Sequence, residues 1–442
     1  MPSPADPALA AEMRRQVRAI FDHALAECSI AQAFDRNVDY VHDLLSIGGQ
    51  TYNLETYSRL VVVSIGKASH SMAEAFEGIV PGRLSGIVSC PAAPPSRVTG
   101  LQYFLGGHPM PNEDSLRAGA AILSMLRELP ARSLALFFIS GGASAIVEQP
   151  IDPALTLLDI VETNRALVHS GAPIAEMNAI RKHLSAVKGG RMARAAFPAT
   201  QVSLLVSDVP DDALDALASG PTMPDSSTVS DCYAIAQRYD MLVRFPERVS
   251  AIFENNQLQE TPKAGDAAFS NSRFVTLLSN QTAVNAAIEQ ATALGFAVEV
   301  DNRCDDWDYV RAADYLLEKL RRLRSQSGRV CLISGGEVTV KVGADSGVGG
   351  RNQQFALCCA QAIAGEAITV LSAGTDGIDG NSNAAGAVVD STTWSHAIQS
   401  GHDPVRALAG FDVFPLLQAT GDVIITGPTG NNVRDLRVLL AY

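Results

Sequence analysis

Short runs of Val, Ile, Leu and Phe recur along the chain, and most lead through small or polar residues into a segment with helical apolar spacing. Continuous apolar runs of about four to eight residues are typical of strands that helices cover on both faces. The alternation predicts an α/β fold with mostly parallel or mixed sheets flanked by helices. The expected strands lie at residues 60–65, 134–139, 202–206, 274–278, 330–333, 368–371 and 423–425.

The chain of 442 residues is too long for one ordinary hydrophobic core, so two domains are expected. A polar stretch at residues 255–271, which contains Pro262 and Gly265, is the best candidate for a boundary. One strand–helix series precedes it and another follows it. The prediction is an N-terminal α/β domain over residues 1–265 and a C-terminal α/β domain over residues 266–442.

Composition restricts the partners and the compartment. The 34 basic residues against 47 acidic residues give a net charge of −13, which disfavours nucleic acid and anionic membranes as partners. The seven cysteines show no zinc-ligand spacing, which suggests free thiols in a reducing compartment. The N-terminal segment predicts an amphipathic helix instead of a signal peptide. We therefore expect a soluble cytoplasmic protein, with a homodimer as one option for its oligomeric state.

Ligands of open α/β sheets bind beyond the carboxyl ends of the strands, so the loops after the apolar runs are the candidate sites. Their small and hydroxylated residues would let backbone N–H groups approach a phosphate, although glycine also serves ordinary tight turns. Neither a Walker A lysine pattern nor a dinucleotide glycine fingerprint occurs. The strongest candidate for a phosphate loop consists of Ser140, Gly141, Gly142, Ala143 and Ser144.

Two cations follow glycine-rich turns. Lys67, between Gly66 and Ala68, would neutralise a transferring phosphoryl group, or it is a solvated surface lysine. Arg351 follows a glycine cluster and would grip a carboxylate or phosphate with two nitrogens, or it forms an ion pair between domains. Replacement of either residue by alanine is expected to lower kcat at least about a hundredfold without affecting the melting curve.

Acidic residues also follow the expected strands. Such carboxylates can hold Mg²⁺ through water or accept a proton from a substrate hydroxyl, and the alternative for each is to cap a helix. The acids concerned are Asp208, Asp212, Glu337, Asp376 and Asp379. His108, in a Gly-Gly-His-Pro turn, either binds substrate or is structural. No Ser/His/Asp triad can be identified from the order of the residues.

As a set, the motifs resemble the glycerate 2-kinase family, whose C-terminal half is called the MOFRL domain. Members have also been labelled hydroxypyruvate reductases of tartrate utilisation. The resemblance runs from about residue 15 to the end of the chain. It rests on Gly66-Lys67-Ala68-Ser69, Gly107-His108-Pro109, Ser140 to Ser144, residues 178–190, Ser207-Asp208-Val209-Pro210, residues 218–222, Ser334-Gly335-Gly336-Glu337, residues 349–353, 375–380 and 384–387, and residues 426–431.

The resemblance implies a Rossmann-like N-terminal domain and a MOFRL domain, with the active site in the cleft between the domains. It also implies ATP and a divalent cation, here Mg²⁺, with transfer of phosphate to the 2-hydroxyl of D-glycerate. On this basis Lys67 and Arg351 are catalytic. Our leading hypothesis adds that one of the strand-end acids, Asp208 or Asp376, orients or deprotonates the hydroxyl. Lys188 and Gly189 join the phosphate loop in binding ATP. Substrate binding is assigned to Ser69, His108, Lys182, Glu337 and Asn352, and metal binding to Asp212, Asp376 and Asp379.

Five positions depart from the family's usual residues. Four of the changes remove a carboxylate and one adds a carboxylate, so metal affinity or substrate choice is open to change. They are Asn112, Asp211, Ala213, Gln354 and Asn383. Two alternatives therefore stay beside the kinase: an NAD(P)H-dependent hydroxypyruvate reductase, and a binding protein for sugar acids or nucleotides that has lost catalysis.

Overall fold

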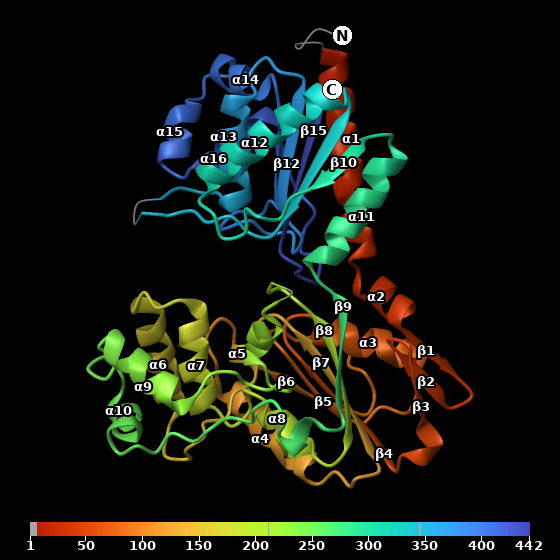
Figure 1. The fold of residues 1–442 in the computed structure, drawn as a ribbon, viewed down its shortest axis with the longest axis vertical. Helices are drawn as coiled ribbons and strands as arrows, with labels where there is room; N and C mark the ends of the chain where they lie inside the picture. Colours follow the sequence, from red (N-terminus) through yellow and green to blue (C-terminus); the bar gives the residue numbers. More distant parts are fainter. Residues whose placement is uncertain (1–6, 211, 344–345) are drawn as a thin grey trace. The chain divides into compact units, whose positions relative to one another are not determined.

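Figure 1 shows the computed structural model of the chain, which describes residues 7–210, 212–343 and 346–442. The chain forms two compact units. One is Ala33–Leu277, and the other combines the N-terminal segment up to Gln32 with Leu278–Tyr442. Each unit has a six-stranded sheet flanked by helices, which confirms the predicted fold class.

The sheet of the unit Ala33–Leu277 has the strand order β6-β5-β4-β7-β8-β9. The strands from β6 to β8 pair in parallel. All their carboxyl ends therefore lie at one edge, where the loops carry the candidate residues. The strands are β4 (Arg59–Ile65), β5 (Gly86–Cys90), β6 (Leu101–Leu105), β7 (Ser133–Ser140), β8 (Thr200–Val206) and β9 (Ser272–Leu278).

Helices cover both faces of this sheet. Successive side chains of a strand point to opposite faces, and here the side chains on both faces are apolar. In β7, Phe137 belongs to the core that α4 (Glu113–Arg127) and α8 (Arg191–Ala196) close. Its neighbour Phe138 contacts Phe34 and Phe76 on the opposite face. A small antiparallel sheet and a separately packed helical group complete the unit. The remaining elements are α2 (Ile30–Asn37), β1 (Val38–Val41), β2 (Leu44–Ile47), β3 (Gln50–Asn53), α3 (Ser69–Ile79), α5 (Ala143–Ile146), α6 (Leu157–His169), α7 (Ile174–Leu184), α9 (Val229–Arg238) and α10 (Glu247–Glu254).

The second sheet is mixed, in the order β10-β11-β15-β12-β13-β14. The last strand, β15, runs antiparallel to both β11 and β12. Its amino end therefore lies at the same sheet edge as the carboxyl ends of those two strands. The elements are α11 (Asn280–Ala293), β10 (Ala297–Val300), α12 (Tyr309–Gln326), β11 (Val330–Gly335), α13 (Arg351–Ala362), β12 (Ile368–Gly374), β13 (Gly386–Asp390), α14 (Thr393–Gln399), α15 (Pro404–Ala409), α16 (Val413–Thr420), β14 (Val423–Ile424) and β15 (Asp435–Ala441).

The division of the chain differs from the predicted boundary at residue 265. Helix α1 (Pro7–Glu27) packs against α11 and belongs to the core of the unit that contains residues 278–442. Strand β9, which follows the polar stretch, adds to the sheet of the other unit. The predicted helix at the N-terminus is present, but an amphipathic pattern does not reveal which sheet its apolar face will cover.

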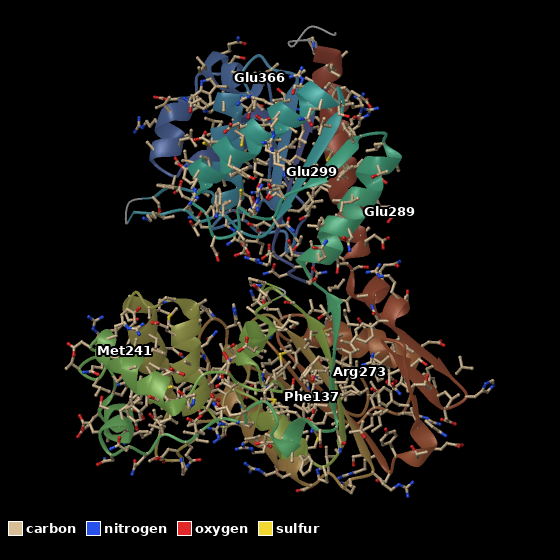
Figure 2. All side chains as sticks on the ribbon, in the orientation of Figure 1. Phe137, Met241, Arg273, Glu289, Glu299 and Glu366 are labelled. Carbon is tan, nitrogen blue, oxygen red and sulfur yellow. The ribbon has the colours of Figure 1, made fainter. Side chains whose placement is uncertain are left out.

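Side chains are buried or exposed largely according to their polarity (Figure 2). Phe137 and Met241 lie in the interiors of the sheet layer and the helical group, whereas Glu289 is largely exposed on α11. Among the described residues, no helix combines the length and the apolar character needed to cross a bilayer.

Candidate active site

The loops after β4 and β7 interlock at the carboxyl edge of the first sheet. The Lys67 amide donates to the carbonyl of Gly141 (2.9 Å), and the Ala68 amide donates to Ser140 Oγ (3.0 Å). Gly66 has φ +112°, and a Cβ there would lie 2.4 Å from the Ser140 carbonyl oxygen. The glycine is therefore needed for this close approach, and the two loops form one rigid platform.

Three predicted residues converge on this platform. A Cβ on Gly141 would lie 1.9 Å from Asp208 Oδ2, so the carboxylate contacts the glycine directly. A Cβ on Gly142 would lie 3.2 Å from His108 Nε2 and 3.2 Å from Lys67 Cγ. Side chains from three separate loops thus surround a Gly-Gly pair that offers none of its own.

The charges of this cluster suit an anionic ligand. Lys67 is exposed and forms no ion pair with any residue that the structure describes. Burial, and then the positive charge of Lys67, lower the pKa of His108. The imidazole is therefore neutral at neutral pH and can accept or donate a hydrogen bond, while Lys67 supplies the positive charge.

The hydroxyl groups near the platform have mostly structural partners. Ser69 is fully buried and donates to the carbonyl of Ser89 (2.9 Å), so its predicted contact with substrate stays a prediction that would require this hydroxyl to change partner. Ser140 Oγ holds the two loops together, as described above. Ser144 Oγ lies 3.1 Å from Ser219 Oγ. The loop therefore offers a ligand mainly its backbone.

Lys182 and Lys188 are also internal. Lys182 Nζ donates to Asp225 (3.1 Å) and Asp215 (3.0 Å), and Lys188 forms an ion pair with Glu148. Both lysines are buried, and burial lowers the pKa of Lys188. Both lysines are thus paired with internal acids in this structure, and their predicted contacts with ligand stay predictions.

The sequence also singled out Gly189, Asp212, Asp211 and Asn112 in this unit. The Gly189 amide donates to the carbonyl of Ser219 (3.0 Å), which fixes the turn after Lys188. Asp212 is exposed. Asp211 lies outside the described residues. Asn112 caps α4 by accepting from the Ser115 amide (2.9 Å), so this departure from the family's usual acid preserves a helix cap.

In the second unit, Arg351 is the first residue of α13 and is held by two acids. Its Nε donates to Asp435 Oδ2 (2.6 Å), its Nη2 to Asp435 Oδ1 (3.1 Å), and Nη2 lies 2.6 Å from Glu337 Oε1. Burial, and then the charge of Asp435, raise the pKa of Glu337. The contacts with Asp435 and Glu337 together hold the Arg351 guanidinium in place.

Asp379 caps helix α13 in this structure, and its predicted role as a metal ligand stays a prediction. Its two oxygens accept hydrogen bonds from the amides of Asn352 (3.1 Å) and Gln353 (2.9 Å) and from both side-chain amides. The residue is 3% exposed. Burial, and then repulsion by Asp435, raise the pKa of Asp379 to about 6. The capping alternative, left open by the sequence, is what the structure shows.

The hydrogen bond with Asp379 also fixes the position of the Asn352 side chain. Its side chain donates to Asp379 and accepts from the hydroxyl of Ser372 (2.6 Å), and it is buried. The predicted contact between Asn352 and substrate stays a prediction, since both ends of this amide are already hydrogen-bonded. Asn352 instead links the amino end of α13 to strand β12.

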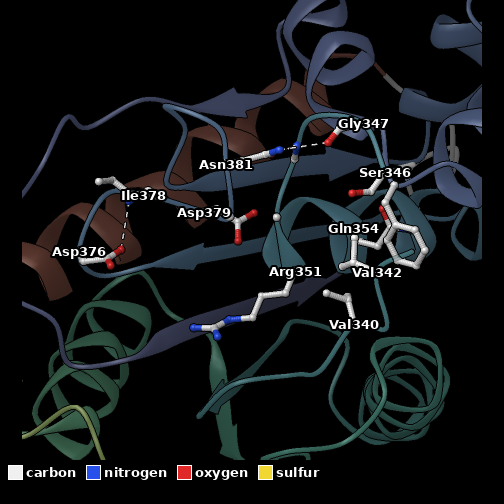
Figure 3. Close-up of a pocket in the computed structure, with 14 residues that line it drawn as sticks. Val340, Val342, Ser346, Gly347, Arg351, Gln354, Asp376, Ile378, Asp379 and Asn381 are labelled. Atoms are coloured by element: carbon white, nitrogen blue, oxygen red, sulfur yellow. Dashed lines mark hydrogen bonds between the residues drawn. The ribbon is translucent and has the colours of Figure 1, made fainter. Parts of the chain in front are cut away.

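A cavity of about 460 Å³ opens beside Arg351 within this unit (Figure 3). One part is charged, with Arg351 and Asp376, and another is apolar. Asp376 Oδ1 accepts from the amide of Ile378 (3.1 Å). The cavity is lined by Val340, Val342, Ser346, Gly347, Gly349, Gly350, Arg351, Gln354, Asp376, Ile378, Asp379, Gly380, Asn381 and Phe411.

Among the described residues, neither unit contains a cluster of side chains already arranged as a metal site. Within residues 7–210, 212–343 and 346–442, no group of three or more His, Cys, Asp or Glu side chains is arranged to hold an ion. Mg²⁺ commonly binds through one or two carboxylates together with substrate phosphates and water, so Asp376 still fits a substrate-borne ion.

Asp435, which holds Arg351, is the residue of this cluster that sequence reasoning missed. The search covered residues after strands, whereas Asp435 begins β15. Because β15 is antiparallel to β12, Asp435 pairs with Gly374 at the carboxyl end of that strand. The only available signal was an acid directly before the last apolar run, and its significance depends on strand direction.

The fold and these loops define a two-part α/β protein, and comparisons with known sequences identify its class. The profile described as a domain of unknown function (DUF4147) matches residues 16–254, and the MOFRL family profile matches residues 330–435. The chain belongs to the family that these two profiles describe. This confirms the resemblance to the glycerate 2-kinase family noted in the sequence.

Individual relatives are more specific. The chain is 35% identical to D-glycerate 2-kinase of Thermotoga maritima over 86% of its length and 89% of the relative's. It is 38% identical, over 97% of its length and 94% of the relative's, to an Agrobacterium vitis protein provisionally named hydroxypyruvate reductase. The crystal structure of Thermotoga maritima glycerate kinase matches with a TM-score of 0.84 and 32% identity, covering 98% of this chain and all of that one.

Proposed function

We propose that this protein is an ATP-dependent glycerate 2-kinase, which transfers the γ-phosphoryl group of ATP to the 2-hydroxyl of D-glycerate and forms 2-phospho-D-glycerate. The observation that carries the proposal is the convergence of Lys67, His108 and Asp208 on Gly141 and Gly142. This cluster lies in a chain related over most of its length to a D-glycerate 2-kinase.

Lys67 and Arg351 have complementary tasks in the proposed reaction. The exposed ammonium of Lys67 stabilises negative charge on the transferring phosphoryl group, above the backbone of Ser140 to Ser144. Arg351, fixed by Asp435 and Glu337, presents its remaining guanidinium edge to an anionic group of the substrates. Preorganised charges of this kind lower the barrier because they need no rearrangement as the reaction proceeds.

The hydroxyl that attacks must be oriented and lose its proton. Asp208 is our choice for this task because its carboxylate lies against Gly141, next to Lys67 and His108. Asp376 remains the alternative. Mg²⁺, when bound with ATP, neutralises phosphate charge, and Asp212 and Asp376 are the acids proposed to hold it. His108 is proposed to hydrogen-bond the substrate.

The decisive experiment supplies D-glycerate and MgATP to the purified protein and identifies the product. Formation of 2-phosphoglycerate with stoichiometric release of ADP supports the proposal. Exclusive formation of 3-phosphoglycerate would contradict the choice of hydroxyl, and no ADP release with any 2-hydroxy acid would contradict kinase activity. A cytoplasmic location is part of the proposal and fits the cysteines, which are all free.

Reduction of hydroxypyruvate is the second candidate because a relative carries that name. The sequence has no dinucleotide glycine fingerprint, which disfavours a nicotinamide cofactor. Loss of NADH or NADPH absorbance with hydroxypyruvate, in a parallel assay without ATP, would favour the reductase.

A further inference from the structure

The cavity beside Arg351 has features that a three-carbon acid does not require. Its volume of about 460 Å³ lies in the range of sites for small organic ligands and cofactors, about 300–1,000 Å³. Its apolar lining comes from Val340, Val342, Ile378 and Phe411. Glycerate carries a carboxylate and two hydroxyls on three carbons, so it has almost no apolar surface to bury there. The walls suit a flat, weakly polar ring system.

Two polar side chains of the cavity, Arg351 and Gln354, come from helix α13. Arg351 and Gln354 are three residues apart, so they lie on the same face of the helix. Figure 3 shows Gln354 beside Val342, away from the end of the Arg351 side chain. The cavity therefore combines a charged part, where Arg351 and Asp376 lie, with an amide among apolar side chains. This combination matches a molecule with an anionic part and an aromatic part.

Gln354 has an unused acceptor. Its Nε2 donates to the carbonyl of Leu408 (2.8 Å) and to the hydroxyl of Tyr309 (3.3 Å). These bonds fix the amide with Oε1 as the acceptor, and Oε1 is buried with no hydrogen-bond partner among the described residues. A buried acceptor without a donor is unfavourable by about 1–3 kcal/mol, so a ligand N–H placed there would bind favourably.

We propose that this cavity, within the second unit alone, holds the adenine base of the nucleotide, and that Gln354 Oε1 accepts a hydrogen bond from the exocyclic amine. The inference rests on the proposed kinase function. Oε1 is covered at present, so the base reaches it when a neighbouring side chain turns aside. Guanine would present a carbonyl oxygen to the same acceptor and be repelled.

The test uses the full-length protein and calorimetric dissociation constants for three nucleotides: ADP, GDP, and the diphosphate of purine riboside, which lacks the amine. We expect ADP to bind at least about tenfold more tightly than either of the others. In Gln354→Met, which keeps the length of the side chain without its acceptor, the three constants are expected to agree within about threefold. The control is Gln361→Met, which makes the same change at an exposed position of α13 outside the cavity lining.

A second variant keeps the test informative if Gln354→Met does not fold. Phe411→Ala removes apolar wall and is expected to weaken all three nucleotides at least about fivefold while leaving the affinity for inorganic tripolyphosphate unchanged. Wild-type binding without preference for ADP, or an unchanged affinity in Phe411→Ala, would overturn the inference.

The outcome for the base site is separable from the outcome for the proposed function. If the protein phosphorylates glycerate with ATP but neither variant changes nucleotide binding, the base lies elsewhere and the kinase assignment stands. If wild-type protein neither binds ADP nor releases it with any 2-hydroxy acid, the kinase assignment and the inference both fall.

Discussion

Lys67 is exposed and has no ionic partner among the described residues, so its substitution changes the charge of the site with little effect on packing. We expect Lys67→Ala to lower kcat at least about a hundredfold, because removal of one preorganised charge commonly raises the barrier by about 2.7–4 kcal/mol. The melting temperature should stay within about 2 °C of the wild type. Steady-state kinetics and calorimetry check both, and activity within tenfold of wild type would contradict the role.

Arg351 demands a different expectation from the one that the sequence suggested. Its removal leaves the buried Asp435 without its partner; because the Arg351 side chain is 34% exposed, the cost lies below the value of about 3–5 kcal/mol for a fully buried pair. Arg351→Ala should therefore lower both kcat and stability. Arg351→Lys keeps the charge but loses the two-point contact with Asp435, and we expect near-normal unfolding with kcat reduced at least about tenfold. Urea unfolding beside kinetics separates the two effects; equal unfolding of both variants would contradict this account.

At the scale of single residues, the sequence placed Lys67, His108 and Asp208 in loops after strands, where the structure has them, whereas Arg351 begins helix α13. It could not distinguish a residue that faces ligand from one that faces the protein. Ser69 and Asn352 are buried and bonded internally, although their loops are the ones expected. The direction of a side chain depends on contacts that are distant in the sequence.

At the scale of elements, the amino end of α13 should respond to pH through Asp379. The folded protein holds this proton up to a pH of about 6, whereas the ordinary value is 3.8. Between these values the folded state binds more protons, so the free energy of unfolding attributable to Asp379 falls as pH rises and stays low above pH 6. At pH 5 this contribution should exceed that at pH 7 by on the order of 1 kcal/mol.

The substitution Asp379→Asn tests this interpretation. The asparagine does not titrate, so the destabilisation that it causes should be larger at pH 5 than at pH 7. Urea titrations of both proteins at the two pH values measure the difference. A destabilisation that is larger at pH 7 would show that the carboxylate is ionised throughout and stabilises the helix as a charged cap.

Whole-element predictions succeeded where the pattern was local. The run at residues 134–139 became β7, and the loop after it became the platform of the site. The direction of a strand was harder to predict from the sequence. The antiparallel β15 brings Asp435 to Arg351, and its direction depends on pairing with strands more than sixty residues away in sequence. Such register and direction arise from packing of the whole sheet.

At the scale of the whole molecule, helix α1 belongs with residues 278–442. Phe21 is fully buried in that core, and Phe→Ala changes in cores cost about 3–5 kcal/mol. Both tryptophans of the chain, Trp307 and Trp394, lie in the same unit. We therefore expect Phe21→Ala to shift the tryptophan fluorescence transition to lower urea concentration.

The matched control is Phe76→Ala, an equally buried residue in the other unit. It should lower the circular dichroism transition with a smaller shift of the fluorescence transition. Equal shifts of fluorescence in both variants would show that the two units unfold together.

The sequence alone determined the α/β class, most strand positions, the glycine loops and the kind of chemistry, because these depend on local periodicity and on motifs that are contiguous in the chain. Tertiary structure decided which of those residues can meet a ligand. It made Asp379 a helix cap and Lys188 an internal ion pair, brought Asp435 to Arg351, and joined α1 to the second sheet. Burial and pairing of charges are properties of the assembled core, and residues far apart in the chain create them together.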